Sequence, residues 1–347
     1  MKKRLCVMTV AVAVLIGGCA TAPPADGPAD DFPEWFLDPS TVYPQQRYMA
    51  AVGSGRDRRD AEQQALAALS QAFEVEIEVD ETTRERYREL MTDSGTMTTS
   101  EIDLTQVRDV RSAQTLLNVQ FGEAFMDQNN RVHIVAYLDR METGRLYVDL
   151  INRNEAQIDG YVSEASGSGD PLRRYAFLSA AEAVAANNDV LKDQLRIISP
   201  PMSATASAGS SRSEIVSRRT DAAQSLPVAI EVTGDTEDRI LPILSRAVAA
   251  ERFPISDSDA VLSVEGAFEI EGIELNPDFE SVAWAFSATF GRADGTTLLT
   301  YDDQGRSSGI TVERAVALAY EDMAVSVEQG FARDLRRFLN ELVLGSD

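Results

Sequence analysis

Residues 48–69, YMAAVGSGRDRRDAEQQALAAL, determine how the first part of the chain folds. An apolar run ends in the Gly-Ser-Gly turn at 53–55. The segment after the turn is rich in alanine at the three- and four-residue spacing of one helix face. We therefore predict a strand at 48–53 and a helix from about Arg58 to Phe73. Phosphate-binding loops share this order of strand, glycine turn and helix, so the turn has to be tested for that chemistry.

The turn lacks the residues of a nucleotide site. A dinucleotide fingerprint needs a third glycine three positions after Gly55, and this position is Arg58. A Walker loop needs Gly-Lys-Ser/Thr, whereas the only lysine beyond position 3 is Lys192. Asp57 and Asp60 would repel phosphate, although neighbouring arginines offset them. We interpret the turn as a structural joint between a strand and a helix.

The remaining sequence predicts further strands and helices in an α+β arrangement. Before residue 199 we expect a half-buried strand at 75–80, a hairpin with strands at 115–127 and 131–139, and helices at about 140–165 and 171–195. The polar segment 81–112 is ambiguous and can form a long hairpin arm. From residue 227 we expect strands at 227–232, 260–275, 281–292 and 297–309, and helices at about 236–253 and 311–344.

These elements group into two small sheet-plus-helix domains. Residues 33–139 form the first α+β domain and residues 227–347 the second. A helical hairpin over 140–198 follows the first domain. The segment 199–226 is poor in large apolar residues, and we interpret it as a linker whose second half can form a short helix.

One internal repeat is visible. The segment ERAVALAYEDMAVSV at 313–327 matches DAEQQALAALSQAF at 60–73 when Ala315 is set on Ala61. Both segments follow a glycine-containing turn after a strand. Two copies of one strand-to-helix unit and a coincidence between alanine-rich helices both explain this match.

The N-terminus has the order of a lipoprotein signal peptide. Three basic residues at 2–4 precede an apolar run that is shorter than the ~20 residues needed to span a bilayer. The segment LIGGC at 15–19 resembles the bacterial lipobox, which implies a lipid, with palmitate among its acyl chains, on Cys19. Residues 1–18 are therefore predicted to be the signal peptide. Residues 19–32, rich in Pro, Ala and Asp, are predicted to be a disordered tether.

Charge and residue counts argue against several classes of function. Without the signal peptide, 29 basic residues remain against 56 acidic ones, which disfavours binding to nucleic acid or adsorption to anionic lipid. Cys6 lies in the signal peptide and Cys19 would carry lipid, so no cysteine remains for a disulfide or a metal site. His133 is the one histidine, which excludes a histidine metal cluster. We predict no cofactor and no metal.

The polar candidates do not combine into a catalytic pattern. His133 alternates with apolar residues and is expected to be a partly exposed strand residue, without a Gly-x-Ser-x-Gly serine to activate. The alternate acidic residues at 76–80 would lie about 6.6 Å apart along one strand face, too far for all three to bind one calcium ion. The acidic residues at 269–278 lack the spacing of an EF-hand loop. We interpret both acidic groups as solvated faces.

The order of these features resembles a known lipoprotein family. After the lipobox and tether come PEWF at 33–36, a Tyr-x-x-x-Val-Gly-x-Gly segment, and an alanine-spaced helix, here with Tyr48, Val52, Gly53, Gly55, Ala61 and Ala65. This order is similar to the Lpp-twenty type of bacterial lipoprotein, named for a twenty-kilodalton outer-membrane antigen, over residues 33–139. The resemblance implies a lipid-anchored envelope component, tied in some members to flagellar or surface structures, and it brings no catalytic residues.

We therefore predict a non-enzymatic lipoprotein of the cell envelope. Lipid on Cys19 would hold it in the outer membrane, facing the periplasm or the cell surface, and Ala20 in place of Asp favours that sorting. It would act as a scaffold or adaptor in outer-membrane, flagellar or surface-structure assembly. Its partner would be an envelope protein or a second copy of itself, and not nucleic acid. A lipid-anchored enzyme that acts on cell wall or glycan through carboxylates, and a solute-binding lipoprotein, are the alternatives.

Overall fold

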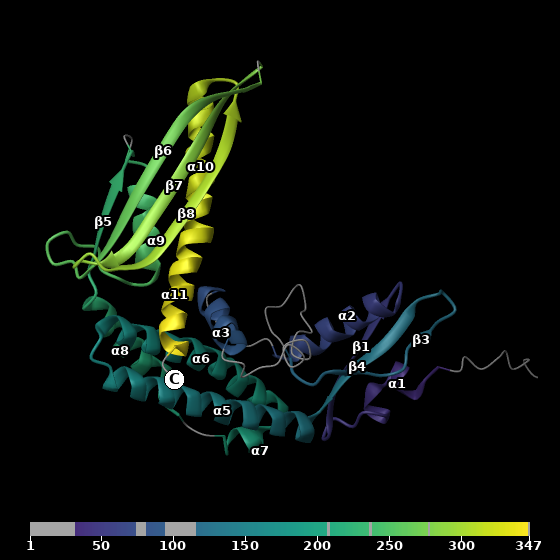
Figure 1. Ribbon diagram of the computed structural model, residues 1–347. Coiled ribbons are helices and arrows are strands. Elements are labelled where there is room, and N and C mark those ends of the chain that lie inside the picture. The colour runs from purple at the N-terminus through teal and green to yellow at the C-terminus, as the bar shows by residue number, and fades with distance from the viewer. Residues whose placement is uncertain are drawn as a thin grey trace, which may run out of the picture.

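The computed structural model describes residues 32–73, 81–93, 116–206, 209–235, 238–276 and 278–345. Of the described residues, 54% are helical and 24% are in strands, and they form two four-stranded sheets, so the predicted α+β fold class is confirmed. Figure 1 shows the two sheets well apart from each other, with a layer of long helices reaching from one to the other.

The N-terminal sheet is built around one central strand. Its members are β1 (Tyr48–Gly55), β2 (Gln120–Phe121), β3 (Phe125–Met126) and β4 (Val132–Asp139). β4 pairs antiparallel with β1 on one side and with β2 and β3 on the other, and the short helix α1 (Glu34–Leu37) precedes β1. The predicted hairpin is present, but its first strand, expected at 115–127, is divided into β2 and β3 around Gly122. The strand predicted at 75–80 lies outside the described residues.

Helix α2 (Arg58–Ser70) covers one face of this sheet and touches the backbone of β1. A Cβ atom at Gly53 would lie 2.0 Å from the backbone nitrogen of Ala65, and one at Gly55 would lie 2.4 Å from that of Ala61. Glycine permits this close approach because it has no Cβ atom. The predicted strand and helix are both present. Gly53, Ser54 and Gly55, expected to form a turn, instead belong to β1 and pair with β4, and the bend into α2 lies at residues 56–57.

A pair of long helices, α5 (Arg140–Gly167) and α6 (Pro171–Ile198), follows β4. The side chains of Asp139 and Asp170 cap their N-termini, and Pro171 lies in the first turn of α6, as the sequence predicts. The predicted helical hairpin is therefore present, and each helix extends two or three residues beyond its expected end.

Helix α3 (Glu81–Asp93) begins the segment for which the sequence allowed a hairpin arm. It packs against α6, and its buried Leu90 and Met91 belong to the same apolar cluster as many α6 residues. A hairpin arm is therefore wrong for this helix, and the rest of that segment, 94–112, lies outside the described residues.

The segment 199–226, interpreted as a linker, is largely helical. It contains α7 (Pro200–Ser203) and α8 (Arg212–Gln224), the second being the short helix that its sequence allowed. Ile215 and Ala223 of α8 are almost fully buried in the cluster that contains α6. The segment is thus part of the packed body, because a narrow face of small apolar residues suffices against a neighbouring helix.

The C-terminal sheet has the strand order β5-β6-β7-β8, with β5 (Val228–Thr233), β6 (Leu262–Asn276), β7 (Phe279–Arg292) and β8 (Thr297–Gly309). β5 is parallel to β6 through the crossover helix α9 (Leu241–Ala250), and the other pairs are antiparallel. The long C-terminal helix consists of α10 (Val312–Ser326), a π-helical turn (Val327–Phe331) and α11 (Ala332–Leu344). The predicted order of strands and helices is confirmed, and α9 is shorter than expected, with Pro242 in its first turn.

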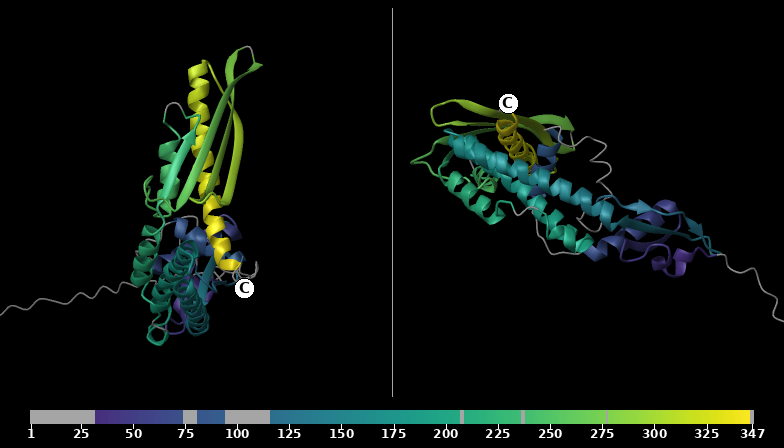
Figure 2. Two further views of the ribbon diagram at one scale, coloured as in Figure 1. Left: turned by 60° about the vertical axis from the view of Figure 1, so that its left-hand side comes forward. Right: turned by 90° about the horizontal axis from the view of Figure 1, so that it is seen from below.

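Two clusters of buried apolar side chains hold these parts together. One joins the N-terminal sheet to α5 and the C-terminal end of α6. The other joins the rest of α6 to α3, α8 and the helix-covered face of the C-terminal sheet. Because α6 contributes to both clusters, continuous side-chain packing links the two sheets. Figure 2 shows α5 and α6 extending from one sheet to the other.

Candidate functional site

The residues singled out in the sequence do not converge on one site. Cys19 and the acidic strand residues Glu76, Glu78 and Asp80 lie outside the described residues. The second acidic group is exposed on β6 and at the turn after it: Glu269, Glu271, Glu274 and Asp278. Within the described parts of the chain, no three or more His, Cys, Asp or Glu residues are grouped so that they could hold a metal ion.

His133 is buried, contrary to the expectation of a partly exposed strand residue. It is only 7% exposed, because the rings of Phe36 and Phe125 lie against it, with centroids 4.7 and 6.2 Å away. Its Nδ1 atom lies 2.6 Å from Ser54 Oγ, and its Nε2 atom lies 3.0 Å from Asp127 Oδ2. The single histidine thus meets Ser54, the residue between the two glycines at the end of β1, because Ser54 and His133 are direct partners in the β1–β4 ladder.

Ser54, His133 and Asp127 are hydrogen-bonded in the same sequence as the residues of a catalytic triad. Their other contacts, however, are those of a structural network. Asp127 also accepts hydrogen bonds from the backbone N–H groups of Arg131 and Asn129, both at 2.9 Å. The bonds from Arg131 and His133 hold the pKa of the Asp127 carboxyl group below its ordinary value. The network therefore fastens β1, β4 and the turn between β3 and β4 to one another.

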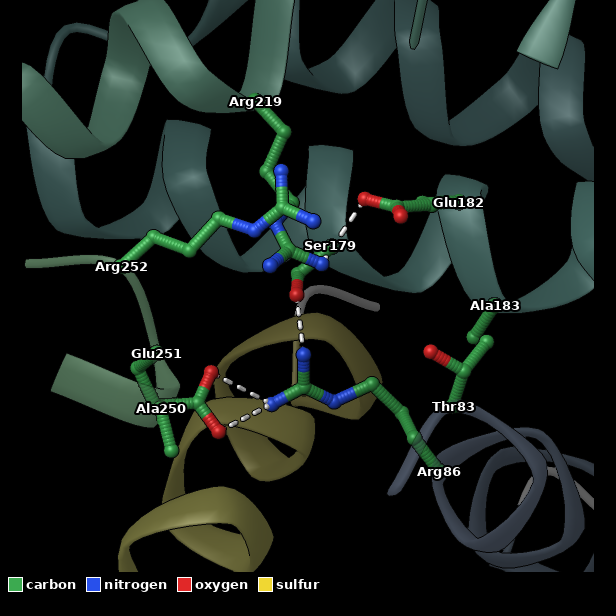
Figure 3. A pocket seen from close by; sticks show the side chains of 9 residues that line it. All are labelled: Thr83, Arg86, Ser179, Glu182, Ala183, Arg219, Ala250, Glu251 and Arg252. Carbon is green, nitrogen blue, oxygen red and sulfur yellow. Dashed lines mark hydrogen bonds and ion pairs between the residues drawn. The ribbon is translucent and has the colours of Figure 1, made fainter. Parts of the chain in front are cut away.

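A polar cavity of about 200 Å³ lies where α3, α6, α8 and the end of α9 meet (Figure 3). Its charged lining residues are Arg86, Arg219, Arg252, Glu182 and Glu251. The lining therefore carries one more positive than negative charge. The hydroxyl groups of Thr83 and Ser179 add further polar atoms.

Arg86 extends from the buried face of α3 to the C-terminal region of the chain. Its Nη2 donates to both carboxylate oxygens of Glu251, at 3.1 and 2.9 Å, and its Nη1 donates to Ser179 Oγ. The Tyr175 hydroxyl donates to Glu251 Oε2 at 2.8 Å and to the Glu251 carbonyl oxygen at 2.6 Å. All four side chains are more than nine-tenths buried. This group connects α3, α6 and the end of α9.

Both members of this ion pair remain charged at neutral pH. Burial by itself would raise the pKa of the Glu251 carboxyl group, but Arg86 and the Tyr175 hydroxyl more than offset it, so that this pKa is lowered. Burial would likewise lower the pKa of Arg86, and Glu251 reverses that effect. Glu251 is therefore a poor proton donor.

A second ion pair lies on the other side of the cavity. Arg219 of α8 donates to Glu182 of α6 at 2.8 Å, and both side chains are less than a tenth exposed. Arg252 follows α9 and is exposed. In Figure 3 the side chains of Arg86, Arg219 and Arg252 all extend toward Ser179. Three guanidinium groups from three different elements thus surround one small space.

Sequence reasoning missed this cluster. One signal pointed to it: Glu182 stands alone in the apolar run YAFLSAAEAVAAN at 175–187, and a buried acid requires a cationic partner. That signal does not identify Arg219, which is 37 positions away. Nor does any local pattern connect Arg86 to Glu251, which are 165 positions apart.

Comparison with known proteins gives a family match for the N-terminal part of the chain. Residues 33–139 match the family model described as LPP20 lipoprotein. Among solved structures, the secreted protein HP1454 from Helicobacter pylori is 13% identical with a TM-score of 0.40, over 83% of this chain and 98% of that one. A minor lipoprotein from Acinetobacter baumannii is 13% identical with a TM-score of 0.25, over 31% of this chain and 94% of that one. A search of curated proteins found no match.

The family match confirms the resemblance predicted from the glycine joint and its helix. It spans the whole N-terminal sheet with α2 and α3, and the names of the family and of these two proteins include no enzyme. In the part of the chain that the structure describes, no helix has both the length and the apolar character needed to cross a bilayer. Residues 33–139 of this chain therefore match the LPP20 lipoprotein family, and this match supports a lipoprotein of the cell envelope.

Proposed function

We propose that the chain is a lipid-anchored outer-membrane protein that acts, without catalysis, as a scaffold or adaptor in the assembly of an envelope, flagellar or surface structure. Lipid on Cys19 anchors it, and Ala20 directs it to the outer membrane, facing the periplasm or the cell surface. Its partner is another envelope protein.

The observation that carries this proposal is the separation of the anchored end from the free end. The tether, predicted at 19–32, leads into the N-terminal domain, and the described residues begin at Phe32. α5 and α6 have 28 residues each, and 28 residues of helix span about 42 Å at ~1.5 Å per residue. The C-terminal sheet rises beyond the other end of this helical layer (Figure 1). Because both sheets share packed cores with α6, the body supports a spacer role.

The free end of the C-terminal sheet carries exposed apolar side chains. Ile310 is 83% exposed, and Phe279 and Val312 are each 50% exposed. The pairing of Glu280 with Gly309 brings these residues to the same end of the sheet, away from α6. We name Phe279, Ile310 and Val312 the apolar tip. Grouped exposed apolar side chains of this kind are typical of protein-docking surfaces.

Affinity purification from crosslinked cells, followed by protein identification, tests this function. The wild-type protein should recover one defined envelope-assembly protein. Ile310→Asp should recover at least tenfold less of it, because a charge on the apolar tip opposes docking. Leu37→Asp is the matched control, since Leu37 is also 83% exposed but lies in α1, in the anchored domain.

Cys19→Ala completes the experiment, because it should lose both membrane association and the partner. Recovery of lipid alone from the wild type would overturn the adaptor proposal. Equal recovery by Ile310→Asp and wild type, or a loss confined to Leu37→Asp, would show that the apolar tip does not bind the partner.

A further inference from the structure

We propose that the cavity between α3, α6, α8 and α9 is a binding site for a small oxyanion, a phosphate or carboxylate group held by Arg86, Arg219 and Arg252. This site is separate from the apolar tip, and its existence does not depend on the adaptor function.

Unpartnered buried donors are the first reason. The Nε atoms of Arg86 and Arg219 have no hydrogen-bond partner, although both side chains are less than a tenth exposed. A buried N–H without an acceptor is costly, and native proteins rarely leave one unpaired. The carboxylates of the lining already accept from the Nη atoms of the same two arginines. An oxyanion in the cavity would supply the missing acceptors.

The surplus positive charge is the second reason. Two of the three lining arginines are paired with the two lining glutamates. Among the described residues, Arg252 has no carboxylate partner, and its Nη1 lies 3.5 Å from the Thr220 hydroxyl oxygen. Arginine forks match the geometry of phosphate and carboxylate groups, so the unpaired charge favours an anion over a cation.

The backbone of Arg252 is the third reason. Its φ angle is +62°, in the left-handed region, directly after Glu251, the C-cap residue of α9. Helix ends favour glycine at this position, because a Cβ atom makes this conformation costly. Elsewhere in the described chain, the other non-glycine residues with positive φ are Asn118, Asn130 and Asp238, whose types tolerate it best. An arginine at an unfavourable backbone position is explained when its side chain has a function.

The size of the cavity limits the ligand. About 200 Å³ is below the usual volume of a pocket for a drug-sized molecule, which begins at roughly 300 Å³. It corresponds to the liquid volume of about six or seven water molecules, at ~30 Å³ each. Inorganic phosphate or a short carboxylate fits this space. A nucleotide or an oligosaccharide is too large.

Binding at this place would stabilise the attachment of the C-terminal sheet. The three arginines come from α3, from α8 and from the residue after α9, so one oxyanion would contact three segments that are distant in the sequence. A ligand that binds only the folded state raises the unfolding temperature, and above its Kd the rise grows with the logarithm of the ligand concentration.

Thermal unfolding and calorimetric titration of the lipidated protein in detergent test this proposal. The protein is first exchanged into a chloride buffer, and sodium phosphate, sulfate or succinate is then added at constant ionic strength. At least one of the three should give a saturable heat of binding with 1:1 stoichiometry and should raise the unfolding temperature with the logarithm of its concentration. The oxyanion that does so identifies the preferred group. If none gives a saturable effect beyond that of chloride, the cavity holds water only and the proposal is wrong.

Arg252→Gly separates binding from folding. Because glycine relieves the left-handed backbone, the variant should unfold at the same temperature as wild type or higher when no oxyanion is present. Its affinity for the oxyanion should fall at least tenfold. Asparagine also tolerates this conformation, so Arg252→Asn should likewise keep its unfolding temperature and lose affinity for the oxyanion. Asn130→Gly is the matched control, since Asn130 has a φ of +57° in the N-terminal sheet, and it should keep wild-type affinity. Wild-type affinity in Arg252→Gly would overturn the assignment.

Discussion

β1 leads into α2 in the N-terminal sheet in the way that β8 leads into α10 in the C-terminal sheet. In each case a glycine near the end of the strand lies directly under the helix. With Ala315 set on Ala61, Gly309 corresponds to Gly55. A Cβ atom would lie 2.4 Å from the Ala61 backbone nitrogen at Gly55 and 2.7 Å from the Ala315 backbone nitrogen at Gly309. The helix faces also correspond, with Ala61, Ala65 and Leu69 in α2 and Ala315, Ala319 and Met323 in α10 all buried. One joint is therefore used twice, and it is tighter in the N-terminal sheet.

The two sheets differ in the polar groups that tie them to their surroundings. In the N-terminal sheet, Ser54, His133 and Asp127 connect strands and a turn of the same domain. At the C-terminal sheet, Arg86 and Glu251 form a fully buried ion pair between segments 165 positions apart. The comparison shows that the joint depends on a strand and the helix after it, whereas the attachment of the C-terminal sheet depends on distant segments.

Arg86→Met should have the largest effect on stability. Removing one partner of a buried ion pair leaves the other charge without compensation, which typically costs about 3–5 kcal/mol. We expect the urea midpoint of unfolding to fall accordingly, with the C-terminal sheet losing its attachment to α3. Arg47→Met is the control, because Arg47 also pairs with a carboxylate, Asp139 at 2.9 Å, but is 67% exposed and should matter little.

Lowering the pH should reproduce part of the loss of stability that we expect for Arg86→Met. The pKa of Glu251 is lower in the folded state than its ordinary value of 4.5, so the unfolded chain binds this proton more readily. The contribution to stability is therefore present above pH 4.5 and is lost as the pH falls through the folded-state pKa. Arg86→Met should show less of this acid loss than wild type. An identical pH dependence in both proteins would contradict the ion-pair argument.

Gly55→Ala and Gly309→Ala test the tighter and the looser copy of the joint. At Gly55 the new methyl group would lie 2.4 Å from helix backbone, which cannot move aside, and we expect a loss of roughly 3 kcal/mol. At Gly309 the nearest atom is also helix backbone, but at 2.7 Å, so the loss should be smaller, about 2 kcal/mol. Chemical denaturation measures both. A larger loss at Gly309 would reverse the order of the two joints.

Removing the N-cap side chains of α2 and α10 should show the smallest difference in stability between the two copies of the joint. Asp57 caps α2 through a hydrogen bond from the Asp60 N–H at 2.9 Å, and Thr311 caps α10 through one from the Arg314 N–H at 3.3 Å. Asp57→Ala should cost about 1 kcal/mol and Thr311→Ala about half of that. Asp57→Asn, which keeps a capping oxygen, should retain most of the stability. Equal losses would show that the longer bond is as effective as the shorter one.

The sequence by itself determined the local structure of this protein. Hydrophobic periodicity and glycine placement encode the passage from β1 to α2, the hairpin around β4, the pair α5 and α6, and the succession of strands and helices after residue 227. These features depend on neighbouring residues along the chain, so they can be recognised without knowing what lies opposite. The predicted lipoprotein signal before Cys19 also rests on a local pattern, and so does the resemblance to the LPP20 family.

The tertiary structure alone decided which polar residues meet. His133 is buried because Phe36 and Phe125 cover it, which its alternating strand pattern does not show. The segments 81–93 and 212–224 are packed helices because α6 offers them apolar surface. The cavity exists because the fold brings α3, α6, α8 and the end of α9 together. Its buried charges are neutralised by residues that are far away in the sequence, as in the pairs Arg86–Glu251 and Arg219–Glu182. Such compensation is a property of the assembled core, since the free energy of a buried charge depends on its neighbours in space and not on its neighbours along the chain.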